Sequence, residues 1–437
     1  MGYGYFTNVR ITDFGPYVTK IILPMPVKPA EEPEKDSFCV YVERRDQQGK
    51  IMQLPKNWLE RDKKEPSVAY AEVTDAYIAG PDGEKNPEGD CIALELAYGP
   101  MHSEVAELSA PDGFNVSIIS DYCITQLKPI QAENEKLAGM VFDRKYGTRC
   151  HDYDDFNESV SHDLKMPLRY GYYVPKGKAE KKPLMIWLHG AGEGGQETKI
   201  AYMGNKVTCM ITPEIQNLFG GCYLFVPQCP TMWMDDGTHV YGRSGKSMYV
   251  QALKSAIDEF LELEPGIDRD RIYIGGDSNG GFMTMRMCID YPDFFAAAFP
   301  VCEALYDDTI SDGQIRRLSE MPIWFVHAKN DPVVAPGETA DATYRRLIAA
   351  GASNIHFSFF DKIVDQHETT DINLPGISAT ESSFQELLQC LENSYDLAVL
   401  SGSLPLNCSD DAYVKMLEVL QKNNTKTIVD ASGKALI

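Results

Sequence analysis

One serine in the chain stands in a pattern that suits nucleophilic catalysis. Gly276, Ser278 and Gly280 form a Gly-x-Ser-x-Gly sequence, which follows an apolar run typical of a strand and precedes an apolar run typical of a helix. Because glycine lacks a Cβ, it allows the tight turn that this pattern needs. The turn would hold the serine hydroxyl at a helix N-terminus, where negative charge is stabilised. A glycine-rich turn that contains a serine by chance is the alternative, but the flanking strand and helix favour a nucleophile.

A glycine-rich loop upstream of the serine is suited to hold an oxyanion. Residues 183–195 read as an apolar strand that ends in His189 and the sequence Gly-Ala-Gly-Glu-Gly-Gly. In catalytic turns of this kind, one backbone N–H comes from such a loop and another from the residue after the nucleophile, Asn279. We therefore predict an oxyanion hole formed by Ala191, Gly192 and Asn279. His189 precedes the serine and is expected to be a structural hydrogen-bonding residue, although it could also border the substrate.

A serine nucleophile needs a base and an orienting acid. Asp331 lies in the loop after the apolar strand expected at Ile323–His327, which makes it the acid candidate, although Asn-Asp-Pro is also an ordinary turn. His327 itself is expected to be packed inside that strand. Only two histidines follow Asp331, and His356 falls in an alternating run that predicts the last strand. His367 follows that strand and is the predicted base, with an exposed loop histidine as the alternative.

Candidates for the substrate pocket are His189, Glu193 and Trp233, although an aromatic side chain at such a position more often belongs to a core. Histidine and aspartate also gather at residues 151–155 and 162–163, where a metal site could be drawn. We favour a solvated acidic loop there. The predicted chemistry uses neither a metal nor a cofactor.

From about residue 137 to 365 the sequence resembles the prolyl-oligopeptidase-like branch of the α/β-hydrolases, in particular esterases with an N-terminal immunoglobulin-like domain. The matching segments are residues 189–195, 226–233, 276–280, 291–298 and 327–334. The resemblance implies an α/β-hydrolase fold, with a mostly parallel sheet flanked by helices, and serine-ester chemistry. The chain departs from these esterases at the base, because they place the triad histidine in a tryptophan-rich Gly-His segment that is missing here.

A second resemblance covers the C-terminal segment. From about residue 364 the sequence is similar to an internal piece of a phosphofructokinase B-type sugar kinase, at residues 368–376, 400–405 and 428–436. The Gly-Ala-Gly-Asp loop that carries the catalytic aspartate of such kinases is missing. We therefore expect a chimeric chain without sugar-phosphorylating activity, joined near residues 362–365. A natural fusion and an artificial junction both remain open.

Three domains are expected from the distribution of elements. Short β-type runs between turn signals predict a β-sandwich over residues 1–127, which the resemblance implies is immunoglobulin-like; we favour a structural role or self-association for it. Alternating strands and helices predict the hydrolase over 128–365, and 366–437 form the kinase-like piece. In the hydrolase we expect strands at residues 168–174, 184–188, 222–226, 272–274, 297–301, 323–327 and 355–360, and helices at 247–263 and 337–350.

Charge and composition restrict the partners. The 437 residues carry a net charge of −23, which argues against binding nucleic acid or an anionic membrane through a basic face. No run approaches the roughly 18 apolar residues of a membrane helix. The eleven cysteines lack CxxC pairs and suggest reduced thiols. Since the N-terminus lacks signal-peptide features, we expect a cytoplasmic protein, or a secreted one if a signal peptide has been removed.

The leading hypothesis from the sequence is a serine carboxylic-ester hydrolase acting on short-chain acyl or aryl esters, including esters derived from plant cell walls. Ser278, His367 and Asp331 would form its triad. A serine peptidase of the oligopeptidase type is one alternative, because the fold is shared. A catalytically impaired hydrolase-fold protein that only binds its ligand is the other.

Overall fold

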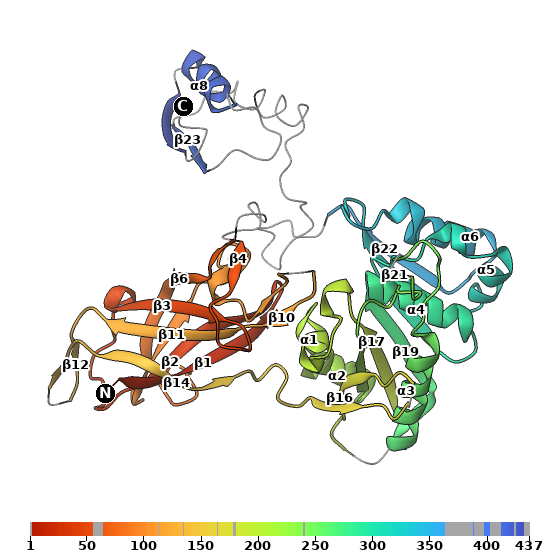
Figure 1. Ribbon diagram of the computed structural model, residues 1–437, viewed down its shortest axis with the longest axis horizontal. Helices are drawn as coiled ribbons and strands as arrows, with labels where there is room; N and C mark the ends of the chain where they lie inside the picture. The colour runs from red at the N-terminus through yellow and green to blue at the C-terminus, as the bar shows by residue number, and fades with distance from the viewer. Residues whose placement is uncertain are drawn as a thin grey trace. The chain divides into compact units, whose positions relative to one another are not determined.

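The computed structural model describes the chain except for residues 1, 56–63, 112, 134, 164, 178–180, 239–240, 363–387, 389–396, 403–411, 424 and 432–437. Contacts divide the chain into two compact units. The first consists of Met1–Leu54 with Lys64–Thr370, and the second of Pro55–Lys63 with Asp371–Ile437. The first unit contains two large sheets, drawn from red to light blue in Figure 1.

The N-terminal part of the first unit is all-β, and its eight principal strands are hydrogen-bonded in the order β6-β3-β11-β14-β1-β2-β8-β7. The bounds are β1 (Tyr3–Thr12), β2 (Gly15–Pro24), β3 (Phe38–Arg45), β6 (Val68–Ala71), β7 (Val73–Ala79), β8 (Cys91–Leu96), β11 (Ile119–Gln126) and β14 (Val141–Arg149). Alternate residues of β3 and β11 are buried, as expected for strands with one face on a core. A β-rich region is confirmed, whereas its immunoglobulin-like character stays a prediction.

β14 lies beyond residue 127, where the sequence analysis ended the N-terminal domain. It pairs in parallel with β1 and antiparallel with β11. The N-terminal sheet therefore takes one of its strands from the segment that had been assigned to the hydrolase.

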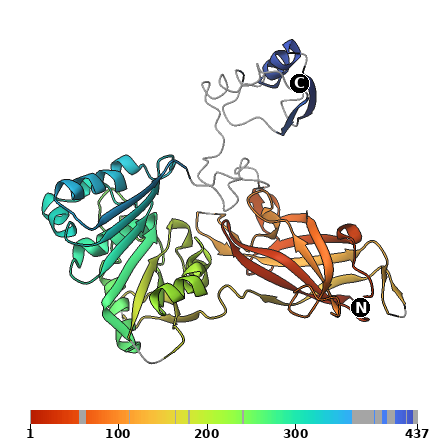
Figure 2. The ribbon, with the colours of Figure 1, turned by 180° about the vertical axis from the view of Figure 1, so that it is seen from behind.

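The second sheet has the order β15-β16-β18-β17-β19-β20-β21-β22 (Figures 1 and 2). Its strands are β15 (Asn157–Val160), β16 (Arg169–Tyr173), β17 (Lys182–Leu188), β18 (Tyr223–Gln228), β19 (Ile267–Asp277), β20 (Ala297–Val301), β21 (Ile323–Ala328) and β22 (Ile355–Phe360). The strands from β18 to β22 in this order run parallel, while β15 and β16 add an antiparallel edge. This is the mixed sheet of an α/β-hydrolase, and the fold class predicted from the sequence is confirmed.

Helices cover both faces of this sheet, which explains why β17 and β18 are buried along almost their whole length. They are α1 (Thr198–Met203), α2 (Pro213–Phe219), α3 (Val250–Leu263), α4 (Asn279–Asp290), α5 (Asp312–Leu318) and α6 (Ala340–Ala349). The side chains of β17 alternate between two cores. Leu184, Ile186 and Leu188 belong to the core that contains α3 and α4. Met185 and Trp187 join a core that contains α1 and the N-terminal sheet.

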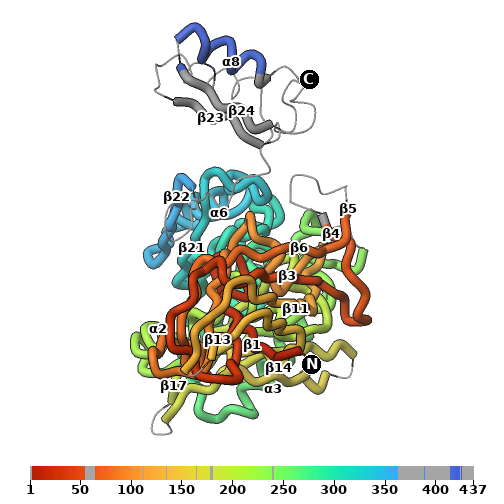
Figure 3. The backbone as a smooth tube through the Cα atoms, turned by 90° about the vertical axis from the view of Figure 1, so that its left-hand side faces the viewer, coloured from red at the N-terminus to blue at the C-terminus, as the bar shows by residue number. Residues whose placement is uncertain are grey.

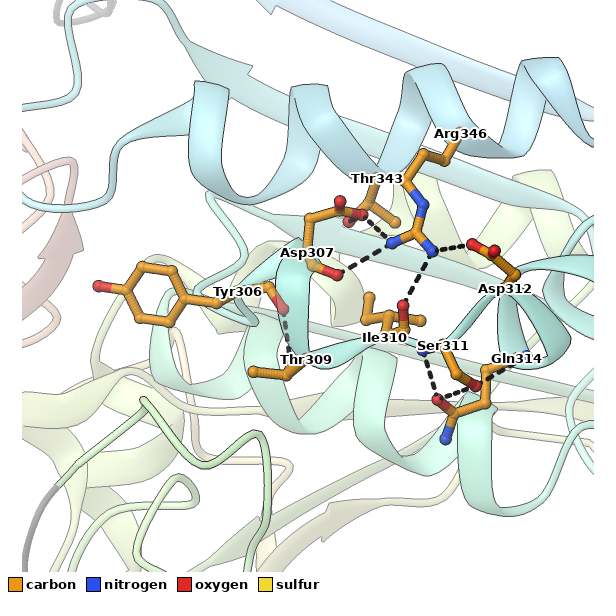
Figure 4. Close-up of polar contacts among 9 residues, drawn as sticks. All are labelled: Tyr306, Asp307, Thr309, Ile310, Ser311, Asp312, Gln314, Thr343 and Arg346. Atoms are coloured by element: carbon orange, nitrogen blue, oxygen red, sulfur yellow. Dashed lines mark hydrogen bonds and ion pairs between the residues drawn. The ribbon is translucent and has the colours of Figure 1, made fainter.

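One arginine anchors α6 to the segment that follows β20 (Figure 4). Arg346 donates to the Asp307 carboxylate and carbonyl at 3.0 Å each, to the Ile310 carbonyl at 2.9 Å and to the Asp312 carboxylate at 2.7 Å. Thr343 of the same helix donates to Asp307 at 3.0 Å. These bonds satisfy carbonyl groups of the irregular chain between β20 and α5, and thereby fix its path.

The second unit contains two parallel strands, β23 (Leu397–Gly402) and β24 (Lys426–Ala431), joined through α8 (Ala412–Lys422). α8, which is labelled in Figure 3, buries Met416 and Leu420. The amphipathic pattern of residues 380–393 predicts a further helix, but these residues lie outside the described part of the chain, apart from Leu388. In the part of the chain that is described, no helix is long and apolar enough to span a membrane.

Candidate active site

Ser278 occupies a strained turn between β19 and α4. Its φ of 52° and ψ of −111° fall in a region that residues other than glycine rarely adopt. The Ser278 N–H donates to the Val301 carbonyl at 2.9 Å, and the Phe282 N–H donates to the Ser278 carbonyl at 2.8 Å. Strain of this kind persists where the surrounding structure enforces it, and it is concentrated at functional sites.

The two glycines of the motif are required by the close approach of β17. A Cβ on Gly276 would lie 2.4 Å from the Leu188 carbonyl oxygen, and a Cβ on Gly280 would lie 1.8 Å from the same atom. Real carbon and oxygen atoms cannot approach this closely. The steric reason that the sequence suggested for the two glycines is therefore confirmed.

The glycine-rich loop follows β17 directly and lies beside the nucleophile turn, because β17 and β19 are parallel neighbours with Leu188 opposite Gly276. Ala191 and Gly192 belong to a short 3-10 turn that extends to Glu193. Asn279 is fully buried, and its side-chain oxygen accepts the Met234 N–H at 3.0 Å. Its own N–H lies in the first turn of α4, as an oxyanion hole needs. The hole itself stays a prediction.

His189 is a structural histidine. Its Nδ1 donates to the Gly190 carbonyl at 2.6 Å, and its Nε2 accepts the Cys229 N–H at 3.1 Å. Burial lowers the pKa of His189 to about 4, so the ring is neutral. The ring packs on Trp233, with centroids 5.2 Å apart. Both side chains are fully buried, so they pack against the loop inside the protein and are not exposed to a ligand.

Asp331 is held as a carboxylate at the end of β21. Its Oδ1 accepts the N–H groups of Val333 and Val334 at 2.9 Å each, and its Oδ2 accepts from His327 Nε2 at 3.1 Å. Partial burial acts to raise the pKa of Asp331, but the hydrogen bonds outweigh it and hold the pKa below its ordinary value. His327 is buried and also donates to the Val334 carbonyl at 3.1 Å. It is the packed histidine that the sequence predicted.

The predicted base, His367, lies outside the described residues. His356 lies on β22, as expected, where its ring packs near Trp324 with centroids 5.7 Å apart. The structure thus brings together the turn and the loop that are predicted to carry the nucleophile and the oxyanion hole. Hydrogen bonds also fix the carboxylate of Asp331, the predicted acid. The part played by His367 stays a prediction.

Two carboxyl groups adjoin the predicted nucleophile: Glu193 is buried and Asp277 is partly buried. The sequence predicted only Glu193 as a site residue. Glu193 is 9% exposed, and burial raises its pKa to about 7. Burial and the nearby Glu193 raise the pKa of Asp277 well above its ordinary value. Asp277 occupies the variable position before Ser278, so no pattern marked it.

Other candidate sites lie away from Ser278. A cavity of about 580 Å³ borders the C-terminal end of α4, the opposite end from the serine. Within the described ranges no group of three or more His, Cys, Asp or Glu side chains is arranged to hold a metal ion. In the acidic segment, His151 contacts Asp154 at 2.8 Å on the exposed surface.

Comparisons with known proteins agree with this geometry. Residues 171–373 match the protein family described as Phospholipase/Carboxylesterase. A stretch of 144 residues, 31% of this chain and 31% of the relative, is 29% identical to poly(3-hydroxyalkanoate) depolymerase C of Paucimonas lemoignei. A stretch of 92 residues, 20% of this chain and 28% of the relative, is 37% identical to 1-phosphofructokinase of Vibrio cholerae serotype O1. The chain spans less than a third of the length of either relative.

A solved structure of a thermostable esterase is similar with a TM-score of 0.68 and 23% identity, over 85% of this chain and 94% of that one. This similarity shows the fold. Together, the family match and the relatives support a hydrolase enzyme of the α/β-hydrolase fold. The chimeric origin of residues 366–437 stays a prediction.

Proposed function

We propose that the protein is a serine carboxylic-ester hydrolase that acts on short-chain acyl or aryl esters. The observation that carries the proposal is the strained Ser278, with its φ of 52°, at the start of α4 and beside the glycine-rich loop. Glycine would adopt this backbone conformation without strain. The presence of a serine there is therefore better explained by its hydroxyl group than by packing. In this state the Ser278 hydroxyl group would lie beside the N–H groups of the proposed oxyanion hole.

In the proposed mechanism, Ser278 Oγ attacks the ester carbonyl carbon while His367 takes the hydroxyl proton and Asp331 orients the imidazole. The N–H groups of Ala191 or Gly192 and of Asn279 stabilise the negative oxygen. The alcohol leaves with the proton from the imidazole. A water molecule then attacks the acyl-enzyme, and its proton returns through His367 to the leaving serine oxygen as the acid departs.

Ester substrates are favoured over peptides by the similarity to a depolymerase of poly(3-hydroxyalkanoate), whose name describes an aliphatic polyester. The family match to Phospholipase/Carboxylesterase points to the same bond. We expect acetyl and butyryl esters to be preferred over long acyl chains.

The test compares nitrophenyl acetate, butyrate and decanoate with a peptide nitroanilide, using the full chain and its Ser278→Ala variant. We expect turnover of the short esters by the natural chain alone, and labelling of Ser278 by a fluorophosphonate. Faster cleavage of the anilide would indicate a peptidase. Absence of both turnover and labelling would reject the enzyme and favour a binding protein.

A further inference from the structure

Two carboxyl groups meet between the oxyanion loop and the nucleophile turn. A Cβ on Gly190 would lie 2.6 Å from Asp277 Oδ2 and 2.9 Å from Glu193 Oε2. Both oxygens therefore face the same small space beside Gly190. One group belongs to the loop that follows β17, and the other immediately precedes Ser278.

The residues around Glu193 leave room for its side chain and form hydrogen bonds with it. A Cβ on Gly204 would lie 2.9 Å from Glu193 Cγ, so this glycine leaves the room that the side chain fills. Asn115 Nδ2, from the N-terminal part of the chain, donates to Glu193 Oε1 at 3.3 Å. Gln228 Nε2 donates to the Glu193 carbonyl at 2.8 Å. The carboxyl group thus accepts from one neutral donor, Asn115, and also borders the space beside Gly190 that Asp277 faces.

Asp277 also has a neutral partner, since Asn205 Nδ2 donates to its Oδ2 at 3.0 Å. Its Oδ1 is buried and has no hydrogen-bond partner among the described residues. The cation next along the chain, Lys206, is paired with Asp13. No ion pair to either carboxyl group occurs in the part of the chain that is described.

Like charges in a buried space without a cation disfavour double ionisation, and such a pair retains a proton that the two groups share. The pKa directions agree with this, because burial raises the pKa of Glu193 to about 7 and that of Asp277 well above its ordinary value. The other polar groups nearby are neutral. They are Asn115, Asn205, the neutral ring of His189 and the Cys302 thiol, whose pKa is raised by burial.

We propose that Glu193 and Asp277 share one proton and act as a positioning pair that ties the oxyanion loop to the nucleophile turn. This inference rests on the proposed ester hydrolysis at Ser278. While the proton is present, one carboxyl group donates to the other and holds the loop beside the serine. When the proton is lost, two negative charges repel each other, and the loop N–H groups move away from the oxyanion.

The direction of the pH effect follows from the raised pKa values. The folded state retains a proton that the unfolded chain has lost once the pH exceeds the ordinary carboxyl pKa. Folding stability therefore falls as pH rises from that value toward and through about 7. Activity falls above the same pH, because only the protonated pair aligns the loop.

The first measurement is the pH profile of kcat and KM for nitrophenyl butyrate between pH 5 and 9.5, with the full chain. The natural chain should lose kcat above neutral pH by about tenfold per pH unit. Glu193→Gln places a permanent amide donor opposite Asp277, so kcat should stay within about twofold of its neutral value up to pH 9. Asp277→Asn should remove the alkaline loss as well. Glu197→Gln, four residues along the chain and in an ion pair with Lys199, should keep the natural profile.

The second measurement is the melting temperature of the same four proteins over the same pH range, which needs no activity. The natural chain and Glu197→Gln should lose stability between pH 5 and 8, and Glu193→Gln should lose markedly less. A flat melting profile for the natural chain, or an unchanged alkaline loss in Glu193→Gln, overturns the proposal. If no ester is turned over, the proposed function fails, and the shared proton is then judged by the melting profiles alone.

Discussion

At the scale of single residues, the proposed chemistry depends on Ser278, which the fold holds in an unfavourable backbone conformation. Ser278→Ala should lower kcat for nitrophenyl butyrate by about 10⁶-fold, because a triad nucleophile cannot be replaced. Its melting temperature should not change, since alanine keeps the same backbone. Ser278→Gly should abolish activity equally but raise the free energy of unfolding by about 1 kcal/mol, because glycine relieves the strain. Activity in the alanine variant above a few per cent would refute the assignment of the nucleophile.

The glycines beside this serine provide a second test at the same scale. Gly280→Ala should lower the free energy of unfolding by about 2 kcal/mol, because the added Cβ would lie 1.8 Å from the Leu188 carbonyl oxygen. Gly337→Ala is the matched control, since no atom lies within 4 Å of its added Cβ. Urea unfolding of both variants measures the difference. Equal midpoints would mean that β17 can move away from the turn at little cost.

Local sequence patterns predict part of the candidate site, but they do not predict that Asp277 lies close to Glu193. Ser278, its glycines and the structural role of His189 follow from local patterns, and the structure confirms the steric and hydrogen-bonding parts. The pairing of Glu193 with Asp277 depends on two strands being neighbours although their residues are far apart in the chain. No local pattern carries that information.

At the scale of elements, the sequence failed to predict the strands that depend on pairing with distant parts of the chain. The strands from β16 to β22 have apolar runs between turns and were predicted within a few residues, except β19, which is longer than expected. β1 and β14 were not predicted, because β1 begins with a Tyr-Gly-Tyr sequence and β14 is rich in charged residues. β1 is hydrogen-bonded between β2 and β14, and β14 between β1 and β11, so neither strand can be recognised from its own residues alone.

The anchoring of α6 is testable at this scale. Arg346→Met should lower the free energy of unfolding by about 1–2 kcal/mol, because it takes a donor from the Asp312 carboxylate and the Ile310 carbonyl and leaves the Asp307 carboxylate with Thr343 alone. Arg345→Met is the control, since Arg345 is exposed and, among the described residues, bonds only to Asp341. Its effect should stay within about 0.5 kcal/mol. Urea midpoints compare the two, and a similar loss in both would show that the Arg346 bonds add little.

At the scale of the whole molecule, the first unit should not divide at residue 127. Its N-terminal sheet and hydrolase share one hydrophobic core, which includes Tyr5 and Val18 from one part and Trp187 and Met203 from the other. The Asn115 N–H also donates to the carbonyl of Gly192 in the oxyanion loop, at 2.7 Å.

A chain that begins at residue 128 would expose this shared core and leave β14 without β1 and β11. We expect it to aggregate on expression, because apolar surface of this extent is not tolerated in a soluble monomer. A chain that ends at residue 370 should instead remain soluble and melt at the temperature of the full chain, since it keeps the whole first unit. Size-exclusion chromatography and thermal melting measure both. A monomeric 128–437 fragment with a cooperative transition and full ester hydrolysis would show that the N-terminal sheet is dispensable for the fold and for the oxyanion loop.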